Sequence, residues 1–283
     1  MKGRNLQTIA IIPARYKSTR LPGKPLLDLA GKPVIQHVYE RTLKARTVDR
    51  VLIATDDERI LSVVTAFGGE AVMTSSSHET GTDRIAEAAR KFEAEIIVNV
   101  QGDEPLIDPA TIDAAVRPLL DDKMLMMSTT CEPLERAEDL FNPNVVKVVM
   151  DESGKALYFS RAPVPFPRAV CQEPQWTGYN PEALIESLQR EPKLLGIYRK
   201  HTGLYVYRRN FLLEFTTWPR TALERAESLE QLRVLERGHR IHVVAVEKSS
   251  IGIDTPADLA RARIELENSK GKRTTKTQRP QRF

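Results

Sequence analysis

This sequence has no long hydrophobic run and few cysteines. Its apolar stretches are strand-sized, well short of the ~20 residues that cross a bilayer. Residues 1–15 contain no apolar region followed by a small-residue cleavage site. The two cysteines, Cys131 and Cys171, provide neither a disulfide framework nor a CxxC metal motif. We therefore expect a cytoplasmic protein with reduced thiols, no export signal and no membrane insertion.

Several well-known motifs are also absent. No GxGxxG string follows the first strand-like segment, and the sequence has no GxxxxGK[ST], HExxH or GxSxG string. These absences argue against a dinucleotide oxidoreductase, a P-loop NTPase, a zincin and an α/β-hydrolase.

Acidic residues are missing from segment 269–283, which carries six cations: Lys270, Lys272, Arg273, Lys276, Arg279 and Arg282. The chain has a net charge of +4, so residues 1–268 alone carry −2. A basic chain usually suggests an acidic macromolecular partner, but here the excess belongs to this tail. The tail has no apolar periodicity, and we expect it to be disordered. Binding of nucleic acid or an anionic surface through the tail stays open as an alternative function, although no nucleic acid is required as a partner.

The first half of the chain alternates strand-like and helix-like segments. With 41% apolar residues, the chain can bury a large core. Strands are predicted at 8–13, 50–55, 71–74 and 96–100, and helices at 33–45, 57–67 and 82–92. This alternation predicts an α/β fold with a mostly parallel, twisted central sheet and helices on both faces. Ligands bind at the carboxyl ends of the strands in such sheets.

The second half is less regular. Strands are predicted at 124–131, 145–150, 156–160, 203–207 and 241–246, with a hairpin turn at 151–155 and helices at 182–189, 223–237 and 256–266. Six prolines make residues 162–192 a loop-rich insertion. We predict one domain, 1–268, divided at about 8–122, about 123–245 and 246–268, followed by the tail 269–283.

Charged residues gather at predicted strand ends. The loop after the first strand contains four cations, among them Arg15, Arg20 and Lys24, and suits a polyphosphate. Asp103 follows the strand 96–100, and Asp254 precedes the last helix. Either aspartate alone is more typical of a cap or a turn. Two carboxylates beside a phosphate loop favour Mg²⁺, which takes one or two protein carboxylates together with substrate phosphates.

These motifs resemble one family. In order from about Ile9 to Leu266, the chain carries strings closely similar to the 3-deoxy-manno-octulosonate (KDO) cytidylyltransferases, or CMP-KDO synthetases. The strings are IIPARYKSTRLPGKPL, ATDDERI, GTDRIAE, VNVQGDEPLI, FNPNVVKVV, ALYFSR, LEQLRVLERG and GIDTPADL.

The resemblance implies a Mg²⁺-dependent, homodimeric nucleotidyltransferase of lipopolysaccharide biosynthesis with a glycosyltransferase-A-like fold. Such an enzyme makes CMP-KDO and pyrophosphate from CTP and KDO, by in-line attack of the sugar's anomeric hydroxyl on the α-phosphorus. A smaller subregion, within about 123–245, would bind the sugar and form the dimer.

The resemblance also implies residue roles. The catalytic residues would be Arg15, Lys24, Asp103 and Asp254, the last two as metal ligands. The CTP-binding set would be Ala14, Arg15, Arg20, Lys24, Thr74, Ser75, Ser77, Gly81, Arg84 and Gln101. The sugar-binding set would be Gln101, Arg161, His201, Tyr205, Glu230 and Gln231.

Some alternatives stay open. The chain between Arg161 and His201 is longer than the family pattern, and a second GxY-like run at 196–198 allows a register that removes His201 and Tyr205 from the site. His201, Glu230 and Gln231 without the motif would be structural or surface residues, as we expect for His37, His78, His239 and His242. Sialic acid or an amino-substituted KDO analogue could replace KDO as the substrate.

Overall fold

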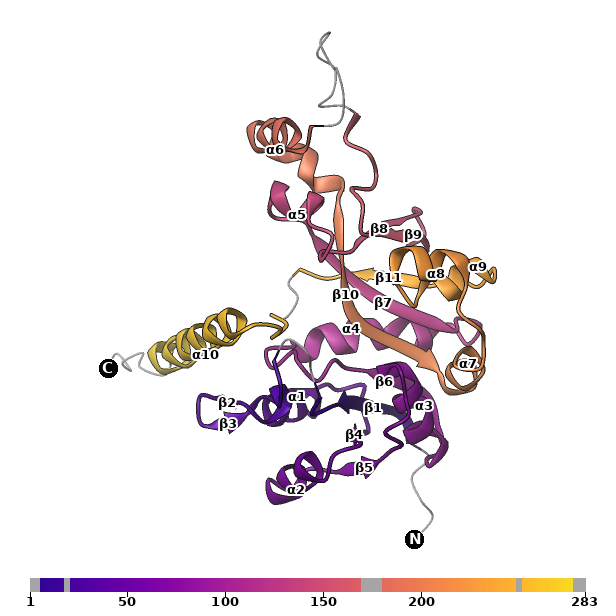
Figure 1. Ribbon diagram of the computed structural model, residues 1–283, viewed down its shortest axis with the longest axis vertical. Coiled ribbons are helices and arrows are strands. Elements are labelled where there is room, and N and C mark those ends of the chain that lie inside the picture. The colour runs from indigo at the N-terminus through magenta and orange to yellow at the C-terminus, as the bar shows by residue number, and fades with distance from the viewer. Residues whose placement is uncertain (1–5, 18–20, 169–179, 248–250, 277–283) are drawn as a thin grey trace, which may run out of the picture. The chain divides into compact units, whose positions relative to one another are not determined.

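The computed structural model describes residues 6–17, 21–168, 180–247 and 251–276 (Figure 1). The chain divides into two compact units. Unit 1 contains residues 1–113 and 250–283, and unit 2 contains residues 114–249, so that the division falls inside helix α4 (Pro109–Asp121). The single domain with three parts that the sequence suggests stays a prediction.

Unit 1 is built on parallel strands in the order β6–β1–β4–β5. Their bounds are Ala94–Asn99, Leu6–Ala14, Arg50–Thr55 and Ala71–Met73. In β1, every residue from Ile9 to Ile12 is fully buried. Because neighbouring side chains of a strand point to opposite faces, both faces of the sheet are covered at this point. The predicted parallel sheet is confirmed, and β4 has the predicted bounds.

Helices α2 and α3 of unit 1 begin at side chains that satisfy their free N–H groups. Asp57 accepts a hydrogen bond from Arg59 N at the start of α2, and Thr80 and Asp83 form a reciprocal capping box at the start of α3. The helices are α1 (Val34–Thr42), α2 (Glu58–Ala66) and α3 (Gly81–Arg90). The sequence did not predict the 3-10 turn η1 (Lys24–Leu26), the short hairpin β2 (Asp28–Leu29) with β3 (Lys32–Pro33), or α4.

The last helix returns to unit 1. α10 (Pro256–Lys276) starts with proline at its first position, where no N–H is needed. Ile253, Ala262 and Leu266 pack with Leu29 and Val34 in one buried cluster. The prediction of a disordered tail is wrong for residues 269–276, which continue α10; no proline interrupts them before Pro280. Residues 277–283 lie outside the described residues.

Unit 2 contains a mixed sheet. β11 pairs in parallel with β7, β7 is antiparallel to β10, and β8 is antiparallel to both β10 and β9. The bounds are β7 Met127–Pro133, β8 Lys147–Met150, β9 Ala156–Ser160, β10 Arg199–Arg208 and β11 His242–Ala245. Asp151 accepts hydrogen bonds from the N–H groups of Ser153 and Lys155 in the predicted turn between β8 and β9.

One predicted helix of unit 2 is wrong. Residues 223–237 form two helices, α8 (Ala222–Glu227) and α9 (Leu232–Glu236). Ser228 has φ +52°, and Leu229 N donates to the Glu224 carbonyl five residues back, which is the bond of a Schellman motif. The left-handed Ser228 therefore ends α8. The sequence also missed α5 (Ala137–Phe141) and α7 (Arg209–Phe215).

The predicted insertion is partly regular. α6 (Pro181–Arg190) begins at Asn180, whose side chain accepts from two N–H groups, and a 3-10 segment, η3 (Pro192–Ile197), follows. Leu188, Leu195 and Tyr198 pack against Leu140 of α5 in a separate buried cluster. Residues 169–179, including Cys171, lie outside the described residues.

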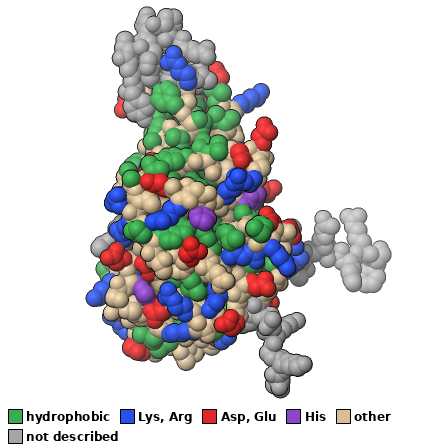
Figure 2. All heavy atoms as spheres, turned by 90° about the vertical axis from the view of Figure 1, so that its right-hand side faces the viewer, with side chains coloured by type: hydrophobic (Ala, Val, Ile, Leu, Met, Phe, Trp, Pro, Cys, Tyr) green, Lys and Arg blue, Asp and Glu red, His purple; other side chains and the backbone are tan. Residues whose placement is uncertain are grey.

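The described residues also bear on surface charge, membrane spans and the state of one thiol. On the face drawn in Figure 2, Lys and Arg side chains are interspersed with Asp and Glu. No helix among the described residues is both long and apolar enough to cross a membrane. Cys131 is buried, and burial raises the pKa of its thiol to about 11, so this thiol stays protonated at neutral pH.

Candidate active site

The loop after β1 is closed by contacts around Tyr16. Gly23 N donates to the Tyr16 carbonyl at 3.0 Å, and Gly23 has φ +69°, a conformation that favours glycine. A Cβ on Gly23 would lie 3.2 Å from the Tyr16 ring, and the Arg59 guanidinium lies 3.3 Å from the ring centroid. Tyr16 thus fixes the point at which the chain enters η1. Arg20, a predicted phosphate ligand, lies outside the described residues.

Lys24 joins the two predicted metal ligands. Its Nζ lies 2.6 Å from Asp103 Oδ2 and 3.0 Å from Asp254 Oδ1. The segments that carry the two aspartates also meet through their main chains, because Ile253 N donates to the Asp103 carbonyl at 2.9 Å. The structure therefore confirms that the two carboxylates converge, and it adds a lysine bridge that the sequence did not predict.

The charges of this triad stabilise one another. The Lys24 side chain is 14% exposed, against 32% for Asp103 and 44% for Asp254. Burial lowers the pKa of Lys24, but the charge and hydrogen bonds of the two aspartates outweigh it, so the pKa lies above the ordinary lysine value. Lys24 therefore stays protonated at neutral pH, and its charge offsets the repulsion between the two carboxylates.

Each aspartate is held by its own backbone. Gly102 approaches β1 so closely that a Cβ there would lie 2.6 Å from the Pro13 carbonyl oxygen. Asp254 is fixed at the start of α10, where its N–H donates to Asp258 Oδ2 at 3.2 Å. Thr255 and Asp258 exchange hydrogen bonds as a capping box. Both carboxylates therefore belong to segments with little freedom to move.

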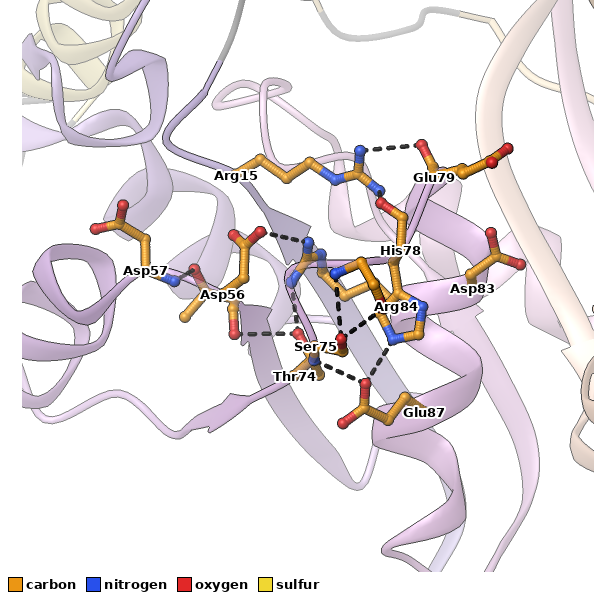
Figure 3. A network of polar contacts seen from close by, with 12 residues as sticks. Arg15, Asp56, Asp57, Thr74, Ser75, His78, Glu79, Asp83, Arg84 and Glu87 are labelled. Atoms are coloured by element: carbon orange, nitrogen blue, oxygen red, sulfur yellow. Dashed lines mark hydrogen bonds and ion pairs between the residues drawn. The ribbon is translucent and has the colours of Figure 1, made fainter.

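A second group of polar residues lies where β4 and β5 end (Figure 3). Arg84 is fully buried and donates to Asp56 Oδ2 at 2.9 Å and to Thr74 Oγ1 at 2.5 Å. Thr74 in turn donates its hydroxyl to the Thr55 carbonyl. Arg84, a predicted CTP-binding residue, thus supports the loop that begins at Thr74. Asp56 was not assigned a role from the sequence.

The loop between β5 and α3 is tied to α3 by Glu87. Glu87 Oε2 accepts a hydrogen bond from Ser75 N at 2.9 Å and lies 2.5 Å from His78 Nε2 (Figure 3). The Ser75 N–H, followed by the His78 side chain, lowers the pKa of Glu87 despite a smaller opposing effect of burial. The sequence missed Glu87 and left His78 as a structural or surface residue, since nothing in their spacing signals the contact.

Arg15 connects this loop to β1. Its guanidinium donates to the carbonyls of His78 at 2.9 Å and Glu79 at 3.0 Å. Burial, and then the charge of Arg84, lowers the pKa of Arg15. The two contacts use two of the five N–H donors of a guanidinium.

The remaining residues predicted for this site lie in the strand-end loops of unit 1 or directly beside them. Ala14 ends β1, Gly81 starts α3, and Gln101 Nε2 donates to Asn99 Oδ1 at 3.2 Å. The Ser75 and Ser77 hydroxyl oxygens lie 2.7 Å apart.

In unit 2, His201 and Tyr205 come together on β10. The pairing of β10 with β7 shifts between Thr202 and Tyr205, and the two rings lie 5.3 Å apart between centroids. The Thr129 hydroxyl contacts His201 Nε2 at 2.9 Å and donates to the Leu204 carbonyl at 2.7 Å. Burial lowers the pKa of His201 to about 3, so its ring is neutral, and burial, followed by the Glu230 charge, raises the pKa of Tyr205.

Arg161, a predicted sugar-binding residue, contacts three main-chain carbonyls of unit 2. Its guanidinium donates to the carbonyls of Glu227 at 2.7 Å, Pro143 at 2.8 Å and Ser228 at 3.3 Å. The buried Lys147 donates to the Arg161 carbonyl at 2.7 Å and to two other carbonyls, and burial lowers its pKa to about 8. These contacts make Arg161 part of the structure that holds the end of α8.

Glu230 and Gln231 follow the turn at Ser228. Gln231 is 4% exposed, and its Nε2 has no hydrogen-bond partner among the described residues. Glu230 lies 3.7 Å from the buried Arg233, which forms a bidentate ion pair with Glu224. A buried amide N–H of this kind suits an oxygen-rich ligand.

Comparison with known proteins gives a consistent result. A family model described as cytidylyltransferase matches residues 9–241. The 3-deoxy-manno-octulosonate cytidylyltransferase of Trichlorobacter lovleyi is 55% identical to this chain, over 91% of the chain and 98% of that protein. The enzyme of the same description from Geotalea daltonii is 56% identical, over 90% of the chain and 96% of that protein.

Solved structures agree with these sequence relatives. A CMP:2-keto-3-deoxy-manno-octonic acid synthetase complexed with CTP matches with a TM-score of 0.82 and 42% identity, over 93% of this chain and 99% of that one. The 4-diphosphocytidyl-2C-methyl-D-erythritol synthase of Anaerococcus prevotii matches with a TM-score of 0.55 at 14% identity, over 93% and 100% of the two chains, which shows likeness of fold alone.

The close approach of Gly102 to β1 can be tested directly. Gly102→Ala places a methyl group 2.6 Å from the Pro13 carbonyl oxygen, so the backbone must shift. Overpacking of this kind costs about 1–3 kcal/mol, and we expect Tm to fall by several degrees in a thermal melt. Gly252→Ala is the matched control, because nothing lies within 4 Å of its added Cβ. Equal Tm values for the two variants would contradict the close approach.

Proposed function

This chain belongs to the 3-deoxy-manno-octulosonate (KDO) cytidylyltransferases, and from that premise we propose which of its residues carry the transfer of CMP from CTP to KDO. The observation that carries the proposal is the convergence of Asp103 and Asp254 on the Lys24 ammonium. It joins the end of β6 to the start of α10, at the edge of a parallel sheet where nucleotides bind.

The two carboxylates fit a magnesium ion. One oxygen of each carboxylate already contacts a cation, the Lys24 ammonium. Carboxylate oxygens are also the hard ligands that Mg²⁺ prefers. No group of three potential metal-ligating side chains occurs in the described part of the chain. A two-carboxylate site of this kind is completed by water and by substrate phosphates. We propose that Asp103 and Asp254 hold Mg²⁺, which when bound neutralises charge on the α-phosphoryl oxygen.

The chain's own residues orient the CTP. Arg15 and Arg84 hold the segment from Thr74 to Glu79. We propose that its first part, from Thr74 to Ser77, contacts the cytosine and ribose. Arg15 keeps N–H donors beyond the two it uses on carbonyls, which supports its proposed contact with the phosphates. Lys24 and Arg20 complete the proposed set that stabilises the pyrophosphate leaving group.

No protein nucleophile takes part in the proposed reaction. The anomeric hydroxyl of KDO attacks the α-phosphorus in line with the departing pyrophosphate, so the protein has to align the reactants and neutralise charge. Alignment alone supplies about 7–11 kcal/mol of barrier reduction when the reacting atoms are well placed.

We propose that the sugar is bound by residues of unit 2. The neutral His201 ring, the protonated Tyr205 hydroxyl and the Gln231 amide together offer both donors and acceptors to a polyhydroxy acid. Arg161 acts on this set by holding the turn at Ser228, two residues before Glu230. The homodimer and the cytoplasmic location remain predictions.

The substrate assignment is tested by measuring pyrophosphate release with CTP, UTP, ATP and GTP, each with and without KDO and Mg²⁺. We expect release only when CTP, KDO and the metal are all present. Sialic acid and 8-amino-KDO are measured in the same assay. If either is turned over faster than KDO at equal concentration, that sugar is the preferred substrate.

Substitution of either proposed metal ligand tests the metal site. Asp103→Asn and Asp254→Asn each remove a charge from it, and the loss of several kcal/mol of charge stabilisation lowers kcat by about 100-fold or more. Circular dichroism should show an unchanged fold. Asp28→Asn is the matched control, since Asp28 is exposed and its nearest ion-pair contact is Arg263 at 3.9 Å. Near-normal kcat in either site variant would remove the metal assignment.

Arg161→Ala tests the sugar set. Loss of three carbonyl contacts loosens the turn before Glu230 and Gln231, so we expect the KM for KDO to rise while the KM for CTP changes little. Arg136→Ala, at an exposed ion pair of the same unit, serves as the control. A KM for KDO equal to that of the unmodified protein would separate Arg161 from sugar binding.

A further inference from the structure

The position between Asp103 and Asp254 is taken by the Lys24 ammonium. We infer that Lys24 is a resident cation that positions both carboxylates before substrate binds, and that a metal ion gains both carboxylates only when Lys24 leaves them. This inference rests on the proposed role of the two aspartates as metal ligands. It assigns Lys24 a function distinct from its proposed contact with phosphate.

The distances place the two cations in competition for the same two carboxylate oxygens. Lys24 Nζ lies 2.6 Å from one carboxylate oxygen and 3.0 Å from the other, which are direct charge-assisted hydrogen bonds. A Mg²⁺ ion bound to those same oxygens would lie about 2.1 Å from each. Both cations would then lie side by side on the same two atoms and would repel each other. The ammonium and the metal are therefore alternatives on these two oxygens.

Lys24 can leave because only its side chain has to move. Its main chain is fixed within η1, where Lys24 N donates to the Leu21 carbonyl and Leu27 N donates to the Lys24 carbonyl. Pro25, the next residue, is buried. The ammonium is carried on a flexible four-carbon stem and is a compact point charge, so it can exchange one anionic partner for another.

The phosphates of CTP would be the new partner. In the unliganded protein, a metal ion alone has to displace Lys24 with no anion to receive the ammonium. When CTP and the metal arrive together, the phosphates receive Lys24 while the metal receives the carboxylates. Metal and nucleotide binding are therefore coupled through the position of one side chain.

Direct measurement of metal binding without nucleotide tests this role. The probe is Mn²⁺ alone, with free Mn²⁺ followed by electron paramagnetic resonance in the unmodified protein and in Lys24→Gln. Loss of the competing ammonium should tighten the Kd for Mn²⁺ by about tenfold, within the usual range of coupling between sites. A role confined to structure would predict the opposite, because loosened carboxylates bind a metal more weakly.

The controls isolate the effect. Lys32→Gln removes another ion-paired lysine of unit 1, 2.7 Å from Glu40, and should leave the Kd unchanged. Lys24→Gln combined with Asp103→Asn should lose the tightened binding. Lys24→Met is the second variant, for use if the Lys24→Gln protein does not fold. A Kd for Mn²⁺ that is unchanged or weaker in the folded Lys24 variant overturns the inference.

Failure of the inference can be distinguished from failure of the proposed function. If Asp103→Asn and Asp254→Asn lose turnover while the Lys24 variants bind Mn²⁺ no more tightly, only the displacement of Lys24 is wrong. If the aspartate variants keep normal turnover, the metal assignment falls, and the inference falls with it.

Discussion

Two carboxylates held against one ammonium form the constraint on which the arrangement of unit 1 depends. Lys24 and Asp103 are 79 residues apart, and Lys24 and Asp254 are 230 apart, so three distant segments must meet at one atom. Gly102 can reach the end of β1 only without a side chain, and the Ile253–Asp103 main-chain bond fixes the approach of the third segment. Packing of α10 against the hairpin β2–β3 then holds that segment in place.

Local patterns predicted much of the fold. β4 and β9 have the bounds that β-branched and aromatic runs indicated, because strands of this kind are specified by their own residues. The helix predicted over 223–237 failed because the apolar spacing continues through Ser228, whereas the break depends on a left-handed residue whose carbonyl and preceding carbonyl both accept hydrogen bonds from Arg161. A contact 66 or 67 residues away leaves no trace in a local pattern.

For the candidate site, the sequence predicted which residues come together but not which side chains they contact. The rule that parallel strands end at one edge placed Asp103 beside the basic loop, and Asp254, which precedes the last helix, was predicted to join it. Neither could assign Lys24 to the carboxylates, because a basic loop next to a phosphate site already explains a lysine. The His78–Glu87 contact was missed for a related reason. Both residues are polar, and their pairing depends on how the loop from Ser75 folds back onto α3.

Arg84 and Lys24 are the central cations of two polar clusters in unit 1. Their contacts differ because a guanidinium and an ammonium differ in geometry. Arg84 is fully buried, and its planar fork is fixed by Asp56 on one side and Thr74 on the other. A guanidinium in that geometry is suited to a permanent contact, because movement would break two directed bonds inside the protein. Lys24 remains partly exposed and bonds through a single nitrogen atom. The Arg84 guanidinium therefore lies where the loop from Thr74 must hold its shape. The Lys24 ammonium lies where we infer that the two carboxylates exchange one cation for another.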